Sequence, residues 1–268
     1  MKISSEEIYR RLEEYFRPWE CTDVFPKIGL QLHYCDFPQK VYTATFASDE
    51  VFTFLKEKGV KNALLFTHHP APQKTDLNLP APPVSQENID FMKENGISFF
   101  SYHIPLDRNS PYAPGFNLAK AMGAEPYAEF YEQNGVKMGL VCRFEAETLE
   151  DVKNALENAI GHKAKIYQYG DSKVKKDTVA IMAGGASNRD IYAYLEKIGV
   201  NVFITGVTNR SVSWVDEVHS QAEAHGINII GGTHLSTEQF APMAMTGFFK
   251  KLGLEAEFIK ETPNFDEL

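Results

Sequence analysis

Residues 41–70 of this 268-residue chain, VYTATFASDEVFTFLKEKGVKNALLFTHHP, decide the fold. The run 41–47 is rich in β-branched and aromatic residues, which predicts a strand. A helix is expected over 49–58, where Gly59 ends it, and a second strand over 63–66. A strand, a helix and a strand at this spacing are typical of a βαβ unit, and therefore of a parallel sheet in an α/β fold.

Strands and helices alternate again in the second half of the chain. The elements expected there are strands over 179–183, 202–205 and 227–230, and helices over 188–198 and 212–224. Two short matches relate the halves: LxxxGV at 55–60 and at 195–200, and a strand followed by HxxxD at 103–107 or by HxxxE at 234–238. An internal duplication would produce these matches, and so would the general tendency of glycine to end helices and of β-branched residues to begin strands.

We therefore expect an α/β protein of two similar α/β halves, by internal duplication, that together form one compact unit. The expected organisation is an N-terminal half over 1–125, a connecting αβ segment over 126–178 and a C-terminal half over 179–268. Five prolines between residues 70 and 83 predict a loop in the first half.

Composition and charge exclude several classes of protein. The net charge of −9 argues against a nucleic-acid partner, because neutralising phosphates requires a basic surface. No apolar run approaches the roughly 18 residues of a membrane span, and the polar, acidic residues 1–14 are not typical of a secretory signal. The three cysteines form no CxxC pair, so we expect a reducing, cytoplasmic location.

Metal-ligand side chains follow three of the predicted strands. The residues are His68 and His69, His103 and Asp107, and His234 and Glu238. In α/β folds, ligands bind beyond the carboxyl ends of parallel strands. Side chains alternate along an extended chain, so His68 and His69 can reach different ions, and i, i+4 spacing on a helix lets His234 and Glu238 approach one centre. We therefore predict a dinuclear metal cleft between the halves that holds two divalent ions, Zn, Fe, Mn or Ni.

Each of these residues, taken alone, also has an ordinary structural interpretation. Asp107 could belong to a turn or an ion pair, and Glu238 could stabilise the start of a helix. The turn Gly184-Gly185 between a strand and a helix could offer backbone N–H groups to an anion, or could simply be a tight turn that needs glycine. The remaining histidines are interpreted as structural: His33, His162, His219 and His225.

These motifs resemble those of the Nif-three-like (YbgI-like) family, many of whose members are labelled GTP cyclohydrolase I type 2 homologues. The matching motifs are Thr67-His68-His69-Pro70, His103-x-x-x-Asp107 with Gly115-x-Asn117 downstream, Gly184-Gly185, Ile204-Thr205-Gly206 and Gly232-x-His234-x-x-x-Glu238. By motif match, the resemblance implies dinuclear metal ligands at His68, His69, Asp107, His234 and Glu238. It also implies a ring-shaped homohexamer.

Two positions depart from the family pattern. Residues 26–31 read Pro-Lys-Ile-Gly-Leu-Gln where the family commonly has Asp-Asn-x-Gly-Leu-Gln, and Val207 stands where the family often has glutamate. Neither departure touches the five ligands, but both bear on substrate contacts.

The leading functional hypothesis is a metal-dependent hydrolase that acts on a nucleotide or another small heterocyclic molecule. His103 is then the expected general acid or base, or else a hydrogen-bond partner that orients Asp107. The alternative is a metal-binding or regulatory scaffold without turnover.

Overall fold

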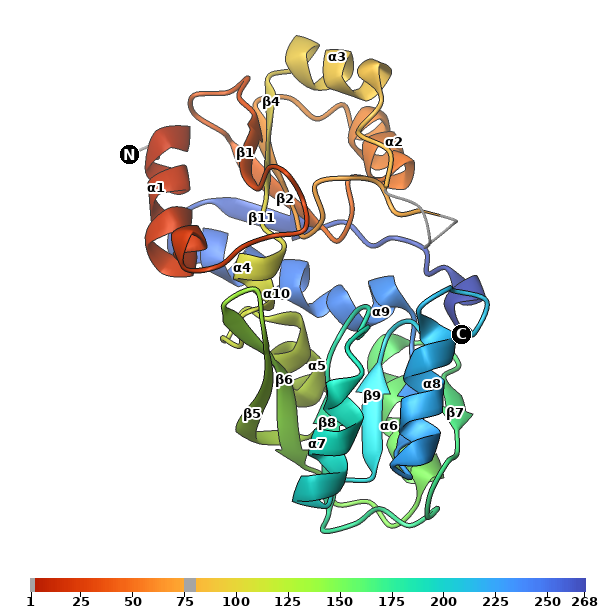
Figure 1. Cartoon of the computed structure of the whole chain (residues 1–268). Coiled ribbons are helices and arrows are strands. Elements are labelled where there is room, and N and C mark those ends of the chain that lie inside the picture. Colours follow the sequence, from red (N-terminus) through yellow and green to blue (C-terminus); the bar gives the residue numbers. More distant parts are fainter. Residues whose placement is uncertain (1–2, 75–80) are drawn as a thin grey trace. The chain divides into compact units, whose positions relative to one another are not determined.

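The computed structural model describes residues 3–74 and 81–268 and is shown in Figure 1. The chain divides into two compact units. The first comprises residues 1–108, 134–136 and 241–261, and the second comprises 109–133, 137–240 and 262–268. The predicted loop over 70–83 lies partly outside the described residues, because 75–80 are not among them.

The first unit is built on a five-stranded sheet in the order β1-β4-β3-β2-β11. Its strands are β1 (Gly29–Leu32), β2 (Lys40–Ala44), β3 (Ala63–Thr67), β4 (Ile97–Ser101) and β11 (Glu255–Phe258). β2, β3, β4 and β11 run parallel, and β1 is antiparallel to β4. The carboxyl ends of β3 and β4 therefore lie side by side at one edge of the sheet.

Helices cover both faces of this sheet. They are α1 (Ser5–Phe16), η1 (Pro18–Glu20), α2 (Asp49–Glu57), α3 (Gln86–Glu94), α4 (Ile104–Asp107) and α10 (Phe240–Lys251). On one face, Phe52 of α2 and Met92 of α3 share an apolar cluster with Leu65 of β3. On the other, the ring of Phe66 lies 5.5 Å from that of Phe249 in α10. Because both faces of β3 are buried, its sequence reads as a continuous apolar run.

The second unit is built on a six-stranded sheet in the order β5-β6-β8-β9-β10-β7. Its strands are β5 (Glu125–Gln133), β6 (Val136–Arg143), β7 (Lys165–Tyr167), β8 (Thr178–Ile181), β9 (Val202–Thr205) and β10 (Asn228–Gly231). β8, β9 and β10 are parallel, while β6 and β7 are antiparallel to their neighbours β8 and β10.

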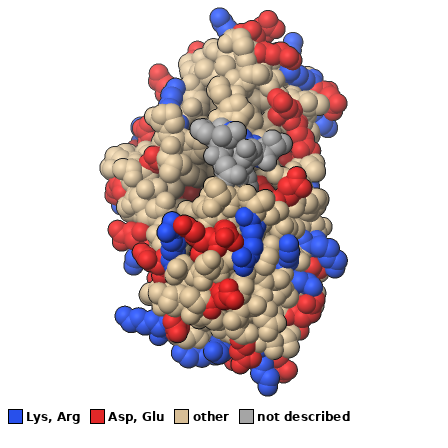
Figure 2. All heavy atoms as spheres, turned by 45° about the vertical axis from the view of Figure 1, so that its right-hand side comes forward, with Lys and Arg blue, Asp and Glu red and all other residues tan. Residues whose placement is uncertain are grey.

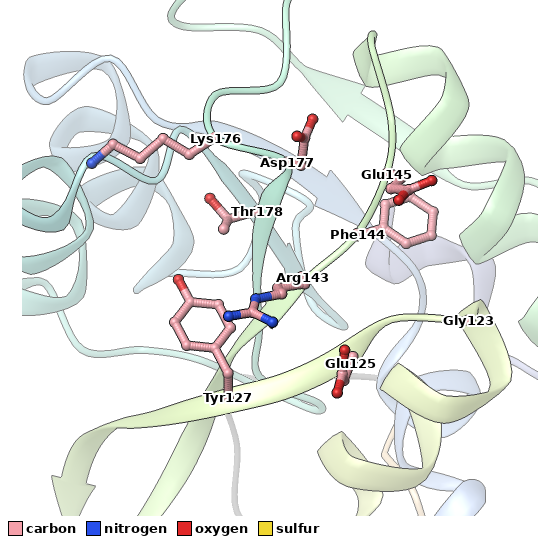
Figure 3. A pocket seen from close by; sticks show the side chains of 9 residues that line it. All are labelled: Gly123, Glu125, Tyr127, Arg143, Phe144, Glu145, Lys176, Asp177 and Thr178. Atoms are coloured by element: carbon pink, nitrogen blue, oxygen red, sulfur yellow. The ribbon is translucent and has the colours of Figure 1, made fainter.

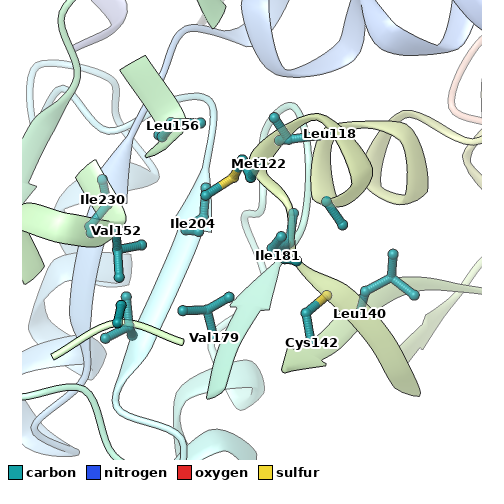
Figure 4. Packing of buried hydrophobic residues seen from close by; sticks show 14 of the residues in the cluster. Leu118, Met122, Leu140, Cys142, Val152, Leu156, Val179, Ile181, Ile204 and Ile230 are labelled. Carbon is teal, nitrogen blue, oxygen red and sulfur yellow. The ribbon is translucent and has the colours of Figure 1, made fainter. Parts of the chain in front are cut away.

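Alternate residues of these strands enter two different cores. The helices of the unit are α5 (Pro114–Met122), α6 (Leu149–Ile160), α7 (Asp190–Ile198), α8 (Val215–Ala224), α9 (His234–Glu238) and η2 (Phe265–Glu267). Ile204 of β9 packs with α5 and α6, as Figure 4 shows, whereas its neighbour Phe203 packs with α7 and α8. This alternation follows from the two-residue period of a strand, and it makes the unit a sheet between two helical layers.

The structure confirms a mixed α/β fold with two sheets. Both units contain three consecutive parallel strands linked by helices, which an internal duplication would produce, although the duplication itself stays a prediction. Residues 126–178, expected as a connecting segment, supply α6, β7 and most of β5 and β6 to the second unit. Residues 241–261, expected in the C-terminal half, supply most of α10 and all of β11 to the first unit. Of the described helices, none has the length and apolar character needed to cross a bilayer.

Candidate metal centre

His68 and His69 follow β3 directly and are held by the backbone. The N–H groups of both residues continue the strand pairing, with donation to Ala44 O at 3.1 Å and to Thr45 O at 2.8 Å. His68 Nδ1 donates to Tyr102 O at 3.0 Å. The neutral imidazole of His68 therefore carries its lone pair on Nε2, the tautomer that a metal ligand needs.

The ring of His69 is oriented by an aromatic neighbour. It stacks on Phe46, with centroids 4.4 Å apart and an interplanar angle of 12°. His68 is fully buried and His69 is 5% exposed. Both imidazoles are thus oriented by the folded unit.

His103 and Asp107 follow β4 and are brought together by the single turn of α4. Asp107 N donates to His103 O at 3.1 Å, so the chain turns back on itself between them. Asp107 Oδ1 lies 3.3 Å from His68 Nε2, and Asp107 Oδ2 lies 3.8 Å from His103 Nε2. The carboxylate thus faces two of the imidazoles.

Three imidazoles converge at this edge of the first sheet. His68, His69 and His103 each offer a ligand nitrogen, and these atoms lie within 4.8 Å of one another. Imidazole nitrogens and a buried carboxylate are ligands that suit Zn, Fe, Mn and Ni. The first unit therefore holds a donor set of metal-binding character, and four of the six residues singled out by sequence meet in it.

The second unit brings the other two residues together on α9. His234 begins this helix and Glu238 ends it. The i, i+4 spacing places His234 Nε2 2.9 Å from Glu238 Oε2. Glu238 is 4% exposed, which is unusual for a carboxylate and typical of one that has a structural or metal partner.

Several contacts fix α9 in place. Thr233 caps its N-terminus, where the hydroxyl oxygen accepts from Ser236 N at 3.1 Å. Thr237 Oγ1 accepts from Gly184 N at 2.9 Å. A Cβ atom added at Gly184, whose φ is +72°, would overlap the Glu238 carboxylate. Gly184 thus leaves the space that the Glu238 carboxylate occupies. Its N–H group donates to Thr237, which favours a structural role for this turn over an anion-binding role.

Two carboxylates that the sequence did not point to accept hydrogen bonds from site residues. Asp23 accepts from His103 Nδ1 at 3.0 Å in the first unit. In the second unit, Glu267 Oε2 accepts from the backbone N–H of His234 at 2.6 Å, and Glu267 is fully buried. Each is an acidic residue far along the chain from its partner. No local sequence pattern therefore identifies either of them.

The histidines interpreted as structural have structural partners. His33 pairs with Asp36 at 2.9 Å and His225 with Glu196 at 2.7 Å. His219 donates to Thr208 O at 2.8 Å, and burial lowers its pKa. His162 is different in one respect, since its Nε2 accepts from the Ser236 hydroxyl on α9 at 2.5 Å.

A separate cavity is formed by other residues. It has a volume of about 820 Å³, lies in the second unit and is drawn in Figure 3. Its lining consists of Gly123, Glu125, Tyr127, Arg143, Phe144, Glu145, Lys176, Asp177 and Thr178. Arg143 lies over the Tyr127 ring at 5.6 Å. The cavity carries charges of both signs and contains none of the proposed metal ligands.

The surface carries charges of both signs. On the face of the described residues that Figure 2 shows, Lys and Arg side chains alternate with Asp and Glu side chains.

Comparison with known proteins defines the class. The chain belongs to the Duf34/NIF3 (NGG1p interacting factor 3) family, whose model matches residues 3–264, and this confirms the resemblance seen in its motifs. A protein of Archaeoglobus fulgidus named GTP cyclohydrolase 1 type 2 homolog is 28% identical over 256 residues, which cover 94% of this chain and 96% of the relative.

Solved structures share the fold. Protein ybgI, described as of unknown function, matches with a TM-score of 0.79 at 19% identity, over 98% of this chain and 100% of its own. A protein of Thermus thermophilus matches with a TM-score of 0.74 at 23% identity, over the same shares of both chains. At these identities the likeness establishes a common architecture.

Proposed function

We propose that this protein binds two divalent metal ions and uses them to hydrolyse a nucleotide or another small heterocyclic substrate. The proposed ligands are His68, His69, Asp107, His234 and Glu238. The observation that carries the proposal is the convergence of the His68 and His69 imidazole nitrogens, which lie within 4.8 Å of each other, with the Asp107 carboxylate 3.3 Å from His68 Nε2. The names of the curated relatives, GTP cyclohydrolase 1 type 2 homolog, point to the same substrate class.

The ligands have distinct proposed roles. Glu238 would be one ligand, with two carboxylate oxygens to offer. His68, His69, Asp107 and His234 would supply the other donors. Bound ions of this kind supply Lewis-acid activation of water and of the bond under attack.

His103 is the proposed general acid or base. It lies beside Asp107 and is 14% exposed at its side chain, so that it is accessible to a substrate while the ligands of the first unit are more deeply buried. A proton acceptor at this position would contribute by positioned proton transfer, which is typically worth about 10²–10⁴-fold in rate.

Elemental analysis tests the metal centre. Protein purified without added metal should contain Zn, Fe, Mn or Ni, and both His68→Ala and Glu238→Ala should lower that content. His225→Ala is the matched control, because His225 is a histidine outside the centre that pairs with Glu196. Less than one ion per chain in the wild type, together with unchanged content in Glu238→Ala, would refute the centre.

A substrate screen tests turnover. The metal-loaded protein should be assayed against nucleotides, phosphoesters and cyclic amides, beginning with GTP, beside the same two ligand variants. Activity that disappears in both variants would support the hydrolase, and activity that survives in them would be contamination.

One observation favours the alternative, a metal-binding or regulatory scaffold. Val207 is buried, at 3% exposure, so it offers no polar group where the family often has glutamate. The scaffold would be supported if the whole panel showed no turnover while a partner protein was recovered with the metal-loaded form. A homohexamer, proposed from the family resemblance, can be measured by light scattering.

A further inference from the structure

A buried carboxylate from a distant part of the first unit lies against His103. Asp23 belongs to the segment between η1 and β1, and its side chain is 4% exposed. Its Oδ1 accepts from His103 Nδ1 at 3.0 Å. Two backbone groups share the same carboxylate, with Ile104 N at 2.8 Å from Oδ2 and Phe25 N at 3.0 Å from Oδ1.

Asp23 is held in its ionised form by these donors. Burial by itself would raise its pKa, but the hydrogen bonds from His103 and from the N–H groups of Phe25 and Ile104 favour the charged carboxylate, and the pKa is lowered. An ionised carboxylate can only accept hydrogen bonds. The proton between the two side chains therefore belongs to Nδ1 of His103.

The orientation of the His103 ring is fixed from a second side. The ring of Phe25 stands edge-on to it, with centroids 5.0 Å apart and an interplanar angle of 81°. The same short segment thus supplies two groups. Asp23 is the acceptor for Nδ1, and the Phe25 ring limits rotation of the imidazole. The other nitrogen, Nε2, is left on the side of Asp107, at 3.8 Å from Oδ2, which is too long for a direct hydrogen bond.

We propose that Asp23 is a positioning residue that holds His103 as the Nδ1–H tautomer, so that the Nε2 lone pair faces the donor set of the first unit. A general base needs such a lone pair aimed at the proton that it removes. Carboxylates that bind the distal N–H of a histidine fix its tautomer and raise its basicity in this way. The part of the inference that concerns proton transfer rests on the proposed function, whereas the tautomer does not.

The test reads the tautomer directly. Full-length protein with nitrogen-15-labelled histidine is saturated with zinc, whose closed shell leaves the resonances sharp, and His103 is assigned from the signals that vanish in His103→Gln. In the wild type, Nδ1 should appear protonated and Nε2 unprotonated. In Asp23→Ala, the proton should be lost from Nδ1 in most molecules, because its acceptor is gone.

Asp36→Ala is the matched control. Asp36 also pairs with a histidine, His33, at 2.9 Å, but on the exposed surface. Its removal should leave the His103 signals unchanged. A wild-type protein with the proton on Nε2 would overturn the proposal even if Asp23→Ala failed to fold, and so would an Asp23→Ala protein that keeps the wild-type tautomer.

Metal content separates positioning from ligation. Asp23→Ala should keep the zinc content of the wild type, and a loss as large as that in His68→Ala would overturn the positioning role. Once a substrate is known, Asp23→Ala should lower kcat at least about tenfold with little change in KM. Failure of the proposed hydrolase would appear as absent turnover in the wild type, whereas failure of this inference would appear in the His103 resonances.

Discussion

Gly184 and Glu238 are complementary in shape. Gly184 has a φ of +72°, and a Cβ atom built on it would overlap Oε1 of the Glu238 carboxylate. The glycine is therefore needed twice, once for its backbone conformation and once for the space that its missing side chain leaves. The space left by the missing side chain is needed only for Glu238, the proposed metal ligand.

Gly184→Ala should displace Glu238 and reduce metal content, in addition to destabilising the protein. The left-handed conformation alone costs an alanine about 1 kcal/mol. Gly123→Ala is the control, since Gly123 in the same unit has a φ of +77° with open space around its Cβ position. Metal content and thermal unfolding should be measured for both variants. Equal metal content in the two would contradict a role of Gly184 in placing the Glu238 carboxylate.

Glu267→Gln should destabilise the second unit and weaken metal binding. The carboxylate accepts from His234 N at 2.6 Å while fully buried, and hydrogen bonds to charged groups contribute about 1.5–3 kcal/mol. Urea unfolding and a zinc titration would measure the two effects. Asp266→Asn, at an exposed position in the same segment, should change neither, and a Glu267→Gln protein with wild-type zinc affinity would show that the bond is only structural.

Thr233→Ala should lower both the stability and the metal affinity. Thr233 caps α9, and loss of an N-cap typically costs about 1 kcal/mol. Thr148→Ala removes the equivalent cap from α6, which carries no proposed ligand. The two variants should therefore lose similar stability by calorimetry, but only Thr233→Ala should bind zinc more weakly.

Glu261 should make the stability of the first unit depend on pH. Burial raises its pKa from 4.5 to about 7, against the opposing hydrogen bonds from Ser48, Phe46 and Thr45. The folded state thus holds this proton more tightly than the unfolded chain. Its stabilising contribution is complete below pH 4.5 and is lost as the pH rises through about 7.

Glu261→Gln should remove this dependence, because the amide does not titrate. From the size of the pKa shift, the free energy of unfolding should fall by about 3 kcal/mol more in the wild type than in the variant between pH 4.5 and about 8. Urea unfolding at each pH measures this difference in the free energy of unfolding. EDTA in the buffer removes any contribution from bound metal. Parallel pH profiles for the two proteins would contradict the assignment.

Local patterns were sufficient to predict most elements of the two sheets. The helix expected over 49–58 is α2 (Asp49–Glu57), and the strand expected over 63–66 is β3 (Ala63–Thr67). β11, in contrast, was missed, because Glu255–Phe258 is short, only partly buried and half charged. Its place depends on pairing with β2, far earlier in the chain, and no local period encodes such a register.

The sequence by itself determined which residues carry the candidate metal chemistry. His68 and His69 directly follow a buried strand, and His234 and Glu238 are spaced by one helical turn, so their placement follows from the periods of a strand and a helix. The tertiary structure alone decided how those side chains are held. Asp23 reaches His103 across 80 positions and Glu267 reaches His234 across 33, because a hydrogen bond between distant residues exists only after packing has brought them together.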